Sequence, residues 1–244
     1  MKFLFFLLVP LLFGIDTQQI LSNYKGRTPF YWGEKAPGVI CTLNTTEKVI
    51  ALTLDACGGE TDGFDKSLID FLIENKIPAT LFINGRWIDK FPAEFNQLAT
   101  NPLFEIENHG LRHLPCSIDG KSAYGIKGTK SIVEIIAEVS GNAQRIESLT
   151  GKKTTFYRSG TAFYDDIATQ IVNQLGHKVA GFSVLGDAGA TFTAKQVESA
   201  VLSAKARDII ICHMNHPESE TSAGLKVAIP QLLIKGYKFV LLKD

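Results

Sequence analysis

The stretch VIALTLDACGGETDGFD, Val49–Asp65, decides the fold. It opens with a short and mostly apolar run, Val49–Leu54, and Gly58-Gly59 bounds that run downstream. Such a run is typical of a strand buried on both faces, most often in a parallel sheet. Asp55 stands where the strand is expected to end, and α/β proteins place their chemistry at this end of their strands. Asp is also a common turn residue, so this stretch alone leaves the role of Asp55 open.

Length and charge bound the class of protein. The chain has 244 residues, which suits one large α/β domain with a sizeable core. Basic and acidic residues balance at 25 each, so the formal net charge is zero, and no basic block stands out. The sequence therefore lacks the electrostatic footprint of a nucleic-acid-binding protein, and no nucleic-acid partner is expected. An uncharged or locally charged substrate fits this balance better.

The N-terminus predicts export. Lys2 precedes an apolar run, Phe3–Phe13, that is too short to span a bilayer as a mature helix, and Gly14 offers a small residue near a cleavage point. This pattern predicts a secretory signal peptide over residues 1–18. Because no A-x-A-like site follows, an uncleaved anchor is the alternative, and a membrane contact is expected only in that case. Either way the domain is expected in the periplasm or outside the cell.

The rest of the chain divides into two parts. Residues 19–48 are polar and rich in turn residues, so we expect a lead-in segment lying across the domain. Residues 49–244 form the domain itself, in which apolar strands alternate about seven times with segments of helical periodicity. The strands are expected at 49–54, 79–83, 104–108, 154–157, 178–184, 208–212 and 237–242, and the helices at 64–75, 93–99, 129–149, 165–175, 194–204 and 223–235. This alternation predicts a parallel sheet with helices outside, either closed into a barrel or left open.

Chemically capable side chains follow five of the expected strands. They are Asp55, the pair His109 and His113, Arg158, Asp187 and His213. Chance placement would scatter such residues to both ends of the strands. Because the carboxyl ends of parallel strands converge on one face of a barrel, these residues are predicted to form one site.

The histidines suggest a metal and an acid. His109 and His113 share a face if their segment forms a helical turn, which suits joint binding of a metal ion through neutral imidazole nitrogens. His213 is a candidate general acid near neutral pH, with a buried structural histidine as the alternative. His216 is a weaker candidate because it lies past the turn and directly before Pro217.

Two further residues have open roles. Arg158 can orient Asp55 and tune its carboxylate, or it can pair with surface acids. Asp187 lies in a glycine-rich loop, LGDAGAT, where a turn role is an equal alternative.

In this order the residues resemble the polysaccharide deacetylase family, the NodB homology domain of carbohydrate esterase family 4. The resemblance covers about Val49 to Leu242. The first family motif, Thr-Phe-Asp-Asp-Gly, is similar to the segment Thr53–Gly58, and the His-x-x-x-His motif matches His109 and His113. The last motif, an apolar strand ending in Leu-His, is similar to Cys212-His213.

Two motifs are degraded. The Arg-Pro-Pro-Tyr motif is matched at Arg158 only, because Ser159-Gly160-Thr161 replaces the rest, and the Asp-Trp motif is at best Asp187-Ala188. The resemblance implies a distorted seven-stranded (β/α) barrel that uses a divalent metal, most often zinc, to remove N- or O-acetyl groups from a glycan. The expected partner is therefore an acetylated polysaccharide or oligosaccharide of the cell envelope.

The resemblance also implies roles. It implies Asp55 as the base, His213 as the acid that protonates the departing amine, and His109, His113 and Asp55 as candidate metal ligands. Arg158 is expected beside Asp55, with a following backbone N–H at the oxyanion, and Asp187 and Thr161 are expected to bind the substrate.

One departure from the family concerns the metal. Where the family places a second Asp, which binds the metal, this chain has Ala56. The replacements left open are Asp55 itself, Cys57 as a thiolate, or an acid from the following loop, namely Glu60, Asp62 or Asp65. An exported protein with four cysteines favours disulfides, and we expect a Cys57–Cys116 bridge at the site rather than ligation by Cys57.

Two other functions stay open. Ala56 and the degraded third motif suit a glycan-binding relative without catalytic activity. A metal-dependent amidase acting on a small molecule other than a sugar is the other alternative. Three aromatic residues in the loops of the expected site face, Tyr124, Phe163 and Tyr164, are candidates either for stacking on sugar rings or for ordinary packing.

Overall fold

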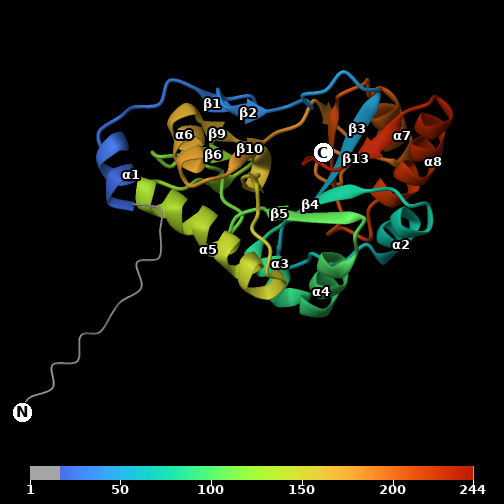
Figure 1. Cartoon of the computed structure of the whole chain (residues 1–244), viewed down its shortest axis with the longest axis horizontal. Helices are drawn as coiled ribbons and strands as arrows, with labels where there is room; N and C mark the ends of the chain where they lie inside the picture. The colour runs from blue at the N-terminus through green and yellow to red at the C-terminus, as the bar shows by residue number, and fades with distance from the viewer. Residues whose placement is uncertain (1–16, 244) are drawn as a thin grey trace, which may run out of the picture.

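The architecture is a curled parallel sheet with helices packed outside it (Figure 1). The computed structural model describes residues 17–243. The predicted signal peptide lies outside these residues except for its last two, which belong to helix α1, Thr17–Tyr24. Within the described part, no helix combines the length and the apolar character needed to cross a membrane.

Nine strands make up the main sheet, and all pairings within it are parallel. Eight of them follow the order β11-β12-β3-β4-β5-β8-β10-β2, and β13 pairs with the first residues of β3. The strands are β2 (Val39–Ile40), β3 (Val49–Ala56), β4 (Ala79–Ile83), β5 (Phe104–Asn108), β8 (Phe156–Tyr157), β10 (Lys178–Ala180), β11 (Val184–Leu185), β12 (Ile209–His213) and β13 (Lys238–Val240).

The helices lie outside the curl of the sheet, and Figure 1 shows α2 and α8 grouped at one end and α5 along one side. The longest, α5, runs from Ile132 to Thr150; Ser131 caps its first turn and Gly151 ends it in a left-handed conformation. The others are α2 (Lys66–Glu74), α3 (Gly85–Lys90), α4 (Pro92–Thr100), α6 (Asp166–Gln174), α7 (Ala194–Leu202) and α8 (Thr221–Ile234).

Strand β3 is buried over its whole length and divides the core. Leu54 and Ala56 belong to the large apolar cluster under the helices, while Val49 and Ala51 belong to a smaller cluster with Phe82. Alternate residues of a strand point to opposite faces of the sheet. Thr53 and Asp55 therefore point into the curl, on the same face as Val49 and Ala51.

Within the described residues, strand pairing does not close the curl into a complete barrel. Its edge strands are β2 and β11, and the segment that follows β2 runs toward β12. There Thr42 forms an isolated antiparallel bridge with Asp208, and the Leu43 N–H donates to the Arg207 carbonyl at 2.8 Å. The predicted fold class, a distorted (β/α) barrel, is confirmed in this partly open form.

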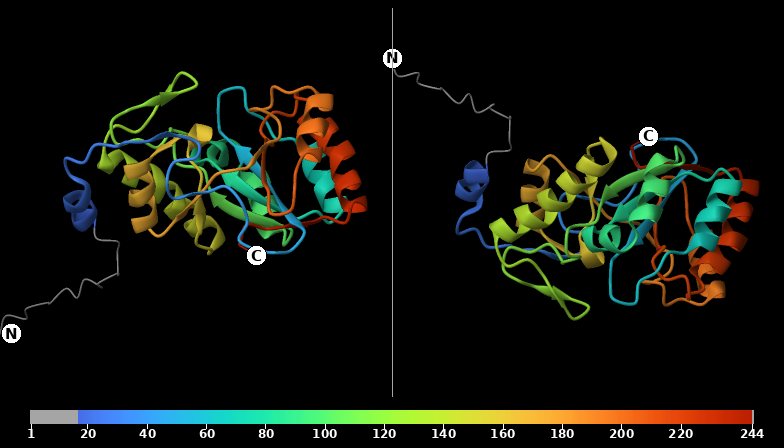
Figure 2. Two further views of the ribbon diagram at one scale, coloured as in Figure 1. Left: turned by 90° about the horizontal axis from the view of Figure 1, so that it is seen from above. Right: turned by 90° about the horizontal axis from the view of Figure 1, so that it is seen from below.

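Two small antiparallel pairs lie outside the main sheet. β1, Trp32–Gly33, joins the lead-in segment to β9, Tyr164–Asp165. β6, Ser122–Ala123, pairs with β7, Ile126–Lys127, in a hairpin that projects from the body of the molecule (Figure 2). The sequence did not predict these pairs. The strand expected at 178–184 is also interrupted: residues 181–183 leave the sheet between β10 and β11.

Candidate active site

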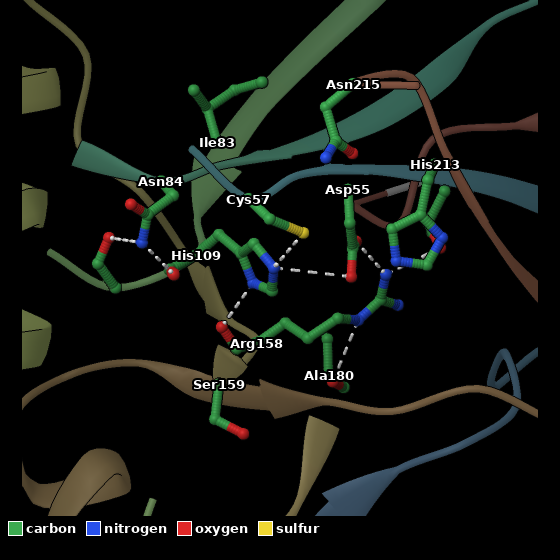
Figure 3. Close-up of polar contacts among 12 residues, drawn as sticks. Asp55, Cys57, Ile83, Asn84, His109, Arg158, Ser159, Ala180, His213 and Asn215 are labelled. Carbon is green, nitrogen blue, oxygen red and sulfur yellow. Dashed lines mark hydrogen bonds and ion pairs between the residues drawn. The ribbon is translucent and has the colours of Figure 1, made fainter. Parts of the chain in front are cut away.

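The carboxyl ends of four strands bring the predicted site residues together (Figure 3). Asp55 and His213 are register partners on the neighbouring strands β3 and β12. His109 follows β5 and Arg158 follows β8. A cavity of ≈ 390 Å³ opens at this end of the sheet and is lined by Asp55, Cys57, His113, Thr161, His213 and others. The convergence expected from the strand ends is therefore present.

Asp55 and Arg158 form a buried ion pair. Arg158 Nη1 lies 2.6 Å from Asp55 Oδ1, and the side chains are 0% and 3% exposed. The same Nη1 donates to Thr53 Oγ1 at 2.9 Å, Nη2 donates to the Gly181 carbonyl at 2.9 Å, and the guanidinium lies 4.1 Å from the ring centre of Phe82. These contacts fix Asp55 Oδ1 and leave Oδ2 turned toward His109, whose Nε2 is 3.6 Å away.

His109 is held through one ring nitrogen and turns the other toward Asp55 and Cys57. Its Nδ1 lies 2.9 Å from the Arg158 carbonyl, which can only accept, so Nδ1 carries the proton and Nε2 is left to bind a ligand. Burial alone would lower the pKa of His109, but the charges of Asp55 and Cys57 raise it above the ordinary value. A metal ion bound at Nε2 would take the place of a second proton there and keep the ring neutral, with its proton on Nδ1.

Cys57, His109 and His113 are placed together as a donor set for a metal ion. One ligating atom from each lies within 4.8 Å of the others, and Cys57 Sγ is 3.8 Å from His109 Nε2. Burial alone would raise the pKa of the Cys57 thiol, but the imidazoles of His113, His109 and His213 hold it well below the ordinary value. A thiolate and two imidazoles are ligands that zinc accepts readily, so these residues fit a divalent metal of that class.

The expected Cys57–Cys116 disulfide is wrong, because all four cysteines carry free thiols. Cys57 faces the cavity and His109, whereas Cys116 is 1% exposed and lies in a separate apolar cluster with Tyr157 and Tyr164. Burial raises the pKa of the Cys116 thiol well above its ordinary value, so this thiol stays protonated.

The segment from His109 to His113 is a loop and not the helical turn that would explain its spacing. His113 has a left-handed backbone with φ 62°. Gly160 lies so close that a Cβ there would stand 2.3 Å from the His113 carbonyl carbon, so only glycine fits. The two rings meet edge to face with their centres 4.8 Å apart.

Side chains that the sequence did not single out hold this loop. Asn84 Nδ2 donates to the carbonyls of His109 and Gly110 at 3.0 and 2.7 Å. From α5, the buried Glu138 accepts the Arg112 and Leu114 N–H groups at 2.9 and 3.2 Å. A sequence signal was present, because Glu138 and Asn142 fall on the face of α5 that otherwise buries Ile135, Val139 and Ile146.

His213 is paired with Asp187 across two strand ends. Its Nδ1 lies 2.9 Å from Asp187 Oδ1, its backbone N–H donates to Oδ2 at 2.7 Å, and Thr221 Oγ1 donates to Oδ2 at 3.0 Å. Burial alone would lower the pKa of His213, but Asp187 raises it well above the ordinary value. Asp187 is fully buried and occupied by these donors. It therefore supports His213, and the expected substrate contact through Asp187 is wrong.

The loop after Arg158 differs in detail from expectation. Thr161 lines the cavity with φ 77°, but its hydroxyl oxygen is buried and has no hydrogen-bond partner among residues 17–243. The Ser159 N–H, the first after Arg158, donates to the Tyr164 hydroxyl at 3.1 Å. That N–H is therefore not free to bind an oxyanion.

Two of the loop acids considered as replacement ligands are used elsewhere. Asp62 Oδ2 accepts from the Gly59 N–H at 2.8 Å and from Asn215 Nδ2 at 2.7 Å. Asp65 caps α2 by accepting the Leu68 N–H at 2.9 Å. Neither joins the group formed by the cysteine and the two histidines.

Three aromatic rings form what we call the aromatic wall, and one of them, Tyr124, lines the cavity. Tyr124, at the tip of the β6–β7 hairpin, meets Phe163 edge to face at 5.4 Å, and Trp32 lies 5.7 Å from Phe163. The Tyr124 hydroxyl lies 3.2 Å from Glu34 Oε1, and both residues line the cavity. Tyr164, the other aromatic candidate, is buried and donates to the Ala180 carbonyl.

Comparison with known proteins gives one family match. The polysaccharide deacetylase model matches residues 42–180, which is more than half of the chain. A peptidoglycan N-acetylglucosamine deacetylase of Bacillus cereus is 25% identical over 203 residues, 81% of this chain and 88% of the relative.

Solved structures share the fold. A pseudoenzyme of carbohydrate esterase family 4 from Bacillus anthracis superposes with a TM-score of 0.69 at 20% identity, covering 85% of this chain and 68% of that chain. A family 4 acetyl xylan esterase from Clostridium thermocellum, in complex with cobalt, superposes with a TM-score of 0.64 at 24% identity, covering 80% of this chain and 89% of that chain.

Proposed function

Because the chain belongs to the polysaccharide deacetylase family, we propose that it is a metal-dependent hydrolase that removes acetyl groups from an N- or O-acetylated glycan of the cell envelope. One observation carries the proposal. The cavity at the strand ends combines a carboxylate fixed by Arg158, a histidine pair beside it, and a third histidine fixed by Asp187. These are the groups that hydrolysis of an amide or ester requires: a base, a site for an electrophile, and an acid.

The histidine pair is the proposed position of the metal. His109 and His113 would hold a divalent ion, and zinc suits imidazole ligands in a site that keeps an open position. Such an ion would supply Lewis-acid chemistry, polarising a carbonyl oxygen and lowering the pKa of water to about 7.

Asp55 is the proposed base. Its Oδ1 is engaged by Arg158 at 2.6 Å, so Oδ2 is the atom that would take a proton from the attacking water. The ion pair fixes the position of the carboxylate, which keeps the base in one orientation as the substrate binds. General-base help of this kind contributes roughly 10²–10⁴ in rate.

His213 is the proposed acid. It lies beside Asp55 in the register of β12 and β3, so base and acid face the same cavity. Its Nδ1 is held by Asp187, which leaves Nε2 to give a proton to the departing amine or alcohol. Asp187 would act as a positioning residue that fixes the tautomer and the direction of the ring.

The cavity lining favours an uncharged sugar. In the described part of the chain, no Lys or Arg lines it, and Tyr124, Ile126, Phe182 and Leu185 supply apolar surface. A sugar ring offers an apolar face and hydroxyl edges, which suit the aromatic wall and the Glu34 carboxylate beside it.

The experiment is acetate release. Zinc-loaded protein is incubated with N-acetylated chitooligosaccharides, peptidoglycan and acetylated xylan, and both acetate and new amino or hydroxyl groups are measured. The proposal expects stoichiometric acetate from at least one of these glycans. Loaded protein that binds the glycans without releasing acetate would instead support a glycan-binding relative, for which Ala56 is the motivating observation. Acetate from small acetamides alone would support an amidase.

Export is a further part of the proposal. Its support is the Lys2 and Phe3–Phe13 pattern together with a substrate class that lies outside the cytoplasm. Fractionation of cells that express the full chain, followed by N-terminal sequencing, should find the protein outside the cytoplasm. A precursor of unchanged mass in the cytoplasm would contradict export.

A further inference from the structure

The direction of side chains along β3 shows where a third metal ligand can stand. Thr53 and Asp55 both contact Arg158 inside the curl of the sheet. Ala56 is fully buried in the apolar cluster under the helices. A carboxylate at position 56 would therefore enter that core without a partner, away from the histidines.

Cys57 follows the direction of Thr53 and Asp55. It is the next residue of the same parity, it lines the cavity, and its Sγ lies 3.8 Å from His109 Nε2. Gly58 makes this placement possible, because it turns at φ +78° where a Cβ would stand 2.6 Å from the Trp87 backbone nitrogen.

One oxygen of the competing ligand from β3 is already occupied. Asp55 Oδ2 lies 3.6 Å from His109 Nε2, but Oδ1 is held by Arg158 at 2.6 Å. The ligating atom of Cys57 lies within 4.8 Å of those of both His109 and His113. The ligating atoms that already lie together are therefore the Cys57 sulfur and one ring nitrogen each from His109 and His113.

We infer that Cys57 is the third protein ligand of the metal site, bound as a thiolate in the place that the family resemblance gives to a carboxylate, and that Asp55 thereby stays free to act as base. The inference rests on the proposed function only in assuming that the histidine pair holds the ion of that site. A soft thiolate favours zinc and cobalt(II) and disfavours magnesium and manganese, which prefer oxygen ligands.

Cobalt(II) provides a test that does not depend on activity. The apoprotein is loaded with one equivalent of cobalt(II), and the near-ultraviolet spectrum is recorded. Wild type should show intense thiolate-to-cobalt charge-transfer absorption, and the matched control Cys41→Ser, which removes a free thiol outside the donor set, should keep it. Cys57→Ser should lose the absorption and weaken zinc binding by at least about 100-fold, since even supporting groups around a metal are worth 10–100-fold.

Two further variants test which of positions 56 and 57 faces the metal site. Cys57→Asp should bind cobalt without the charge-transfer absorption, because a carboxylate replaces the thiolate on the same face. Ala56→Asp combined with Cys57→Ser should not restore binding. Restored binding in that double variant, or cobalt-loaded wild type without charge-transfer absorption, would overturn the inference. Circular dichroism of each apoprotein shows that the variants are folded.

The outcome separates this inference from the proposed function. If the charge-transfer absorption is present but no glycan releases acetate, Cys57 stands as a metal ligand and the proposed deacetylase function is wrong. If the protein releases acetate but lacks that absorption, the proposed function stands and Cys57 is not a metal ligand.

Discussion

Arg158 and Asp55, 103 residues apart in the chain, meet as an ion pair at 2.6 Å in the interior of the curled sheet. The guanidinium also donates to Thr53 and Gly181 and covers the face of Phe82. The pair therefore serves both the packing of the barrel and the orientation of the proposed base.

Removing Arg158 should destabilise the fold strongly. Arg158→Met leaves the buried Asp55 carboxylate without its partner, and breaking such a pair costs about 3–5 kcal/mol of unfolding free energy. Urea unfolding measures the loss. The matched control is Arg145→Met, which breaks an ion pair with Asp89 at the surface and should cost about 1 kcal/mol or less. Similar losses for the two variants would contradict the structural role of the buried pair.

Asp187→Asn should reduce turnover more than binding. The amide keeps the size of the side chain but no longer stabilises a protonated His213 or fixes its tautomer. We expect kcat to fall by about 10²-fold, within the range for general acid–base catalysis, with KM changed by less than about twofold. Asp70→Asn, at a surface pair with Lys66, is the control and should leave both constants unchanged. Equal changes in kcat and KM would point to a disturbed cavity instead.

Tyr124→Ala should weaken glycan binding. The ring is 75% exposed and packs edge to face on Phe163 at the cavity, where an aromatic contact is worth about 0.5–1.5 kcal/mol. KM for an oligosaccharide should rise by roughly 2–10-fold with kcat little changed. Ile234→Ala, an exposed apolar position at the end of α8, is the control. An unchanged KM for every acetylated oligosaccharide would show that the aromatic wall does not contact the substrate.

The fold was predictable because its signals are local. The apolar run at 79–83 and the alternating segment at 104–108 became strands with the expected bounds. The site residues were predictable because parallel strands carry their carboxyl ends to one face, so His109 and Arg158 needed no long-range information. The family resemblance agreed with this arrangement.

The directions of the side chains at positions 56 and 57 were not predictable from spacing. In the first motif, Ala56 stands at the position of the missing carboxylate. Because side chains alternate along a strand, however, Ala56 points into the core and Cys57 points into the cavity. The disulfide failed for the same reason, because pairing depends on the direction of both Cβ atoms. Cys116 points into an apolar cluster that no local pattern indicates.

The β6–β7 hairpin was missed because its turn is unusual. Tyr124 and Gly125 both have positive φ, 51° and 77°, and a tyrosine is not among the residues that mark such turns. The aromatic wall depends on this hairpin and on the lead-in segment, which meet only in the folded chain.

His177 should make stability fall in acid. It is 8% exposed, its Nε2 lies 2.9 Å from Thr154 Oγ1, and burial lowers its pKa below the ordinary 6.5. The neutral ring therefore stabilises the fold at pH values above 6.5, and this contribution is lost as the pH falls through the lower pKa of the folded state. Between pH 7 and pH 5, the unfolding free energy of His177→Gln should depend less steeply on pH than that of wild type. The two slopes should differ by at most about 1.4 kcal/mol per pH unit. An unchanged slope in urea titrations would contradict the assignment.

The most direct test of the central claim, that Asp55 is the base beside a separately held metal, compares zinc-loaded wild type with Asp55→Asn. Acetate release and bound zinc are measured on the same samples, with the best glycan substrate. We expect the Asp55→Asn variant to keep one zinc per chain, because the metal keeps its ligands. Its acetate release should fall by at least about 10²-fold, because the base is gone. Loss of zinc together with activity would show that Asp55 binds the metal, and unchanged acetate release would show that it is not the base.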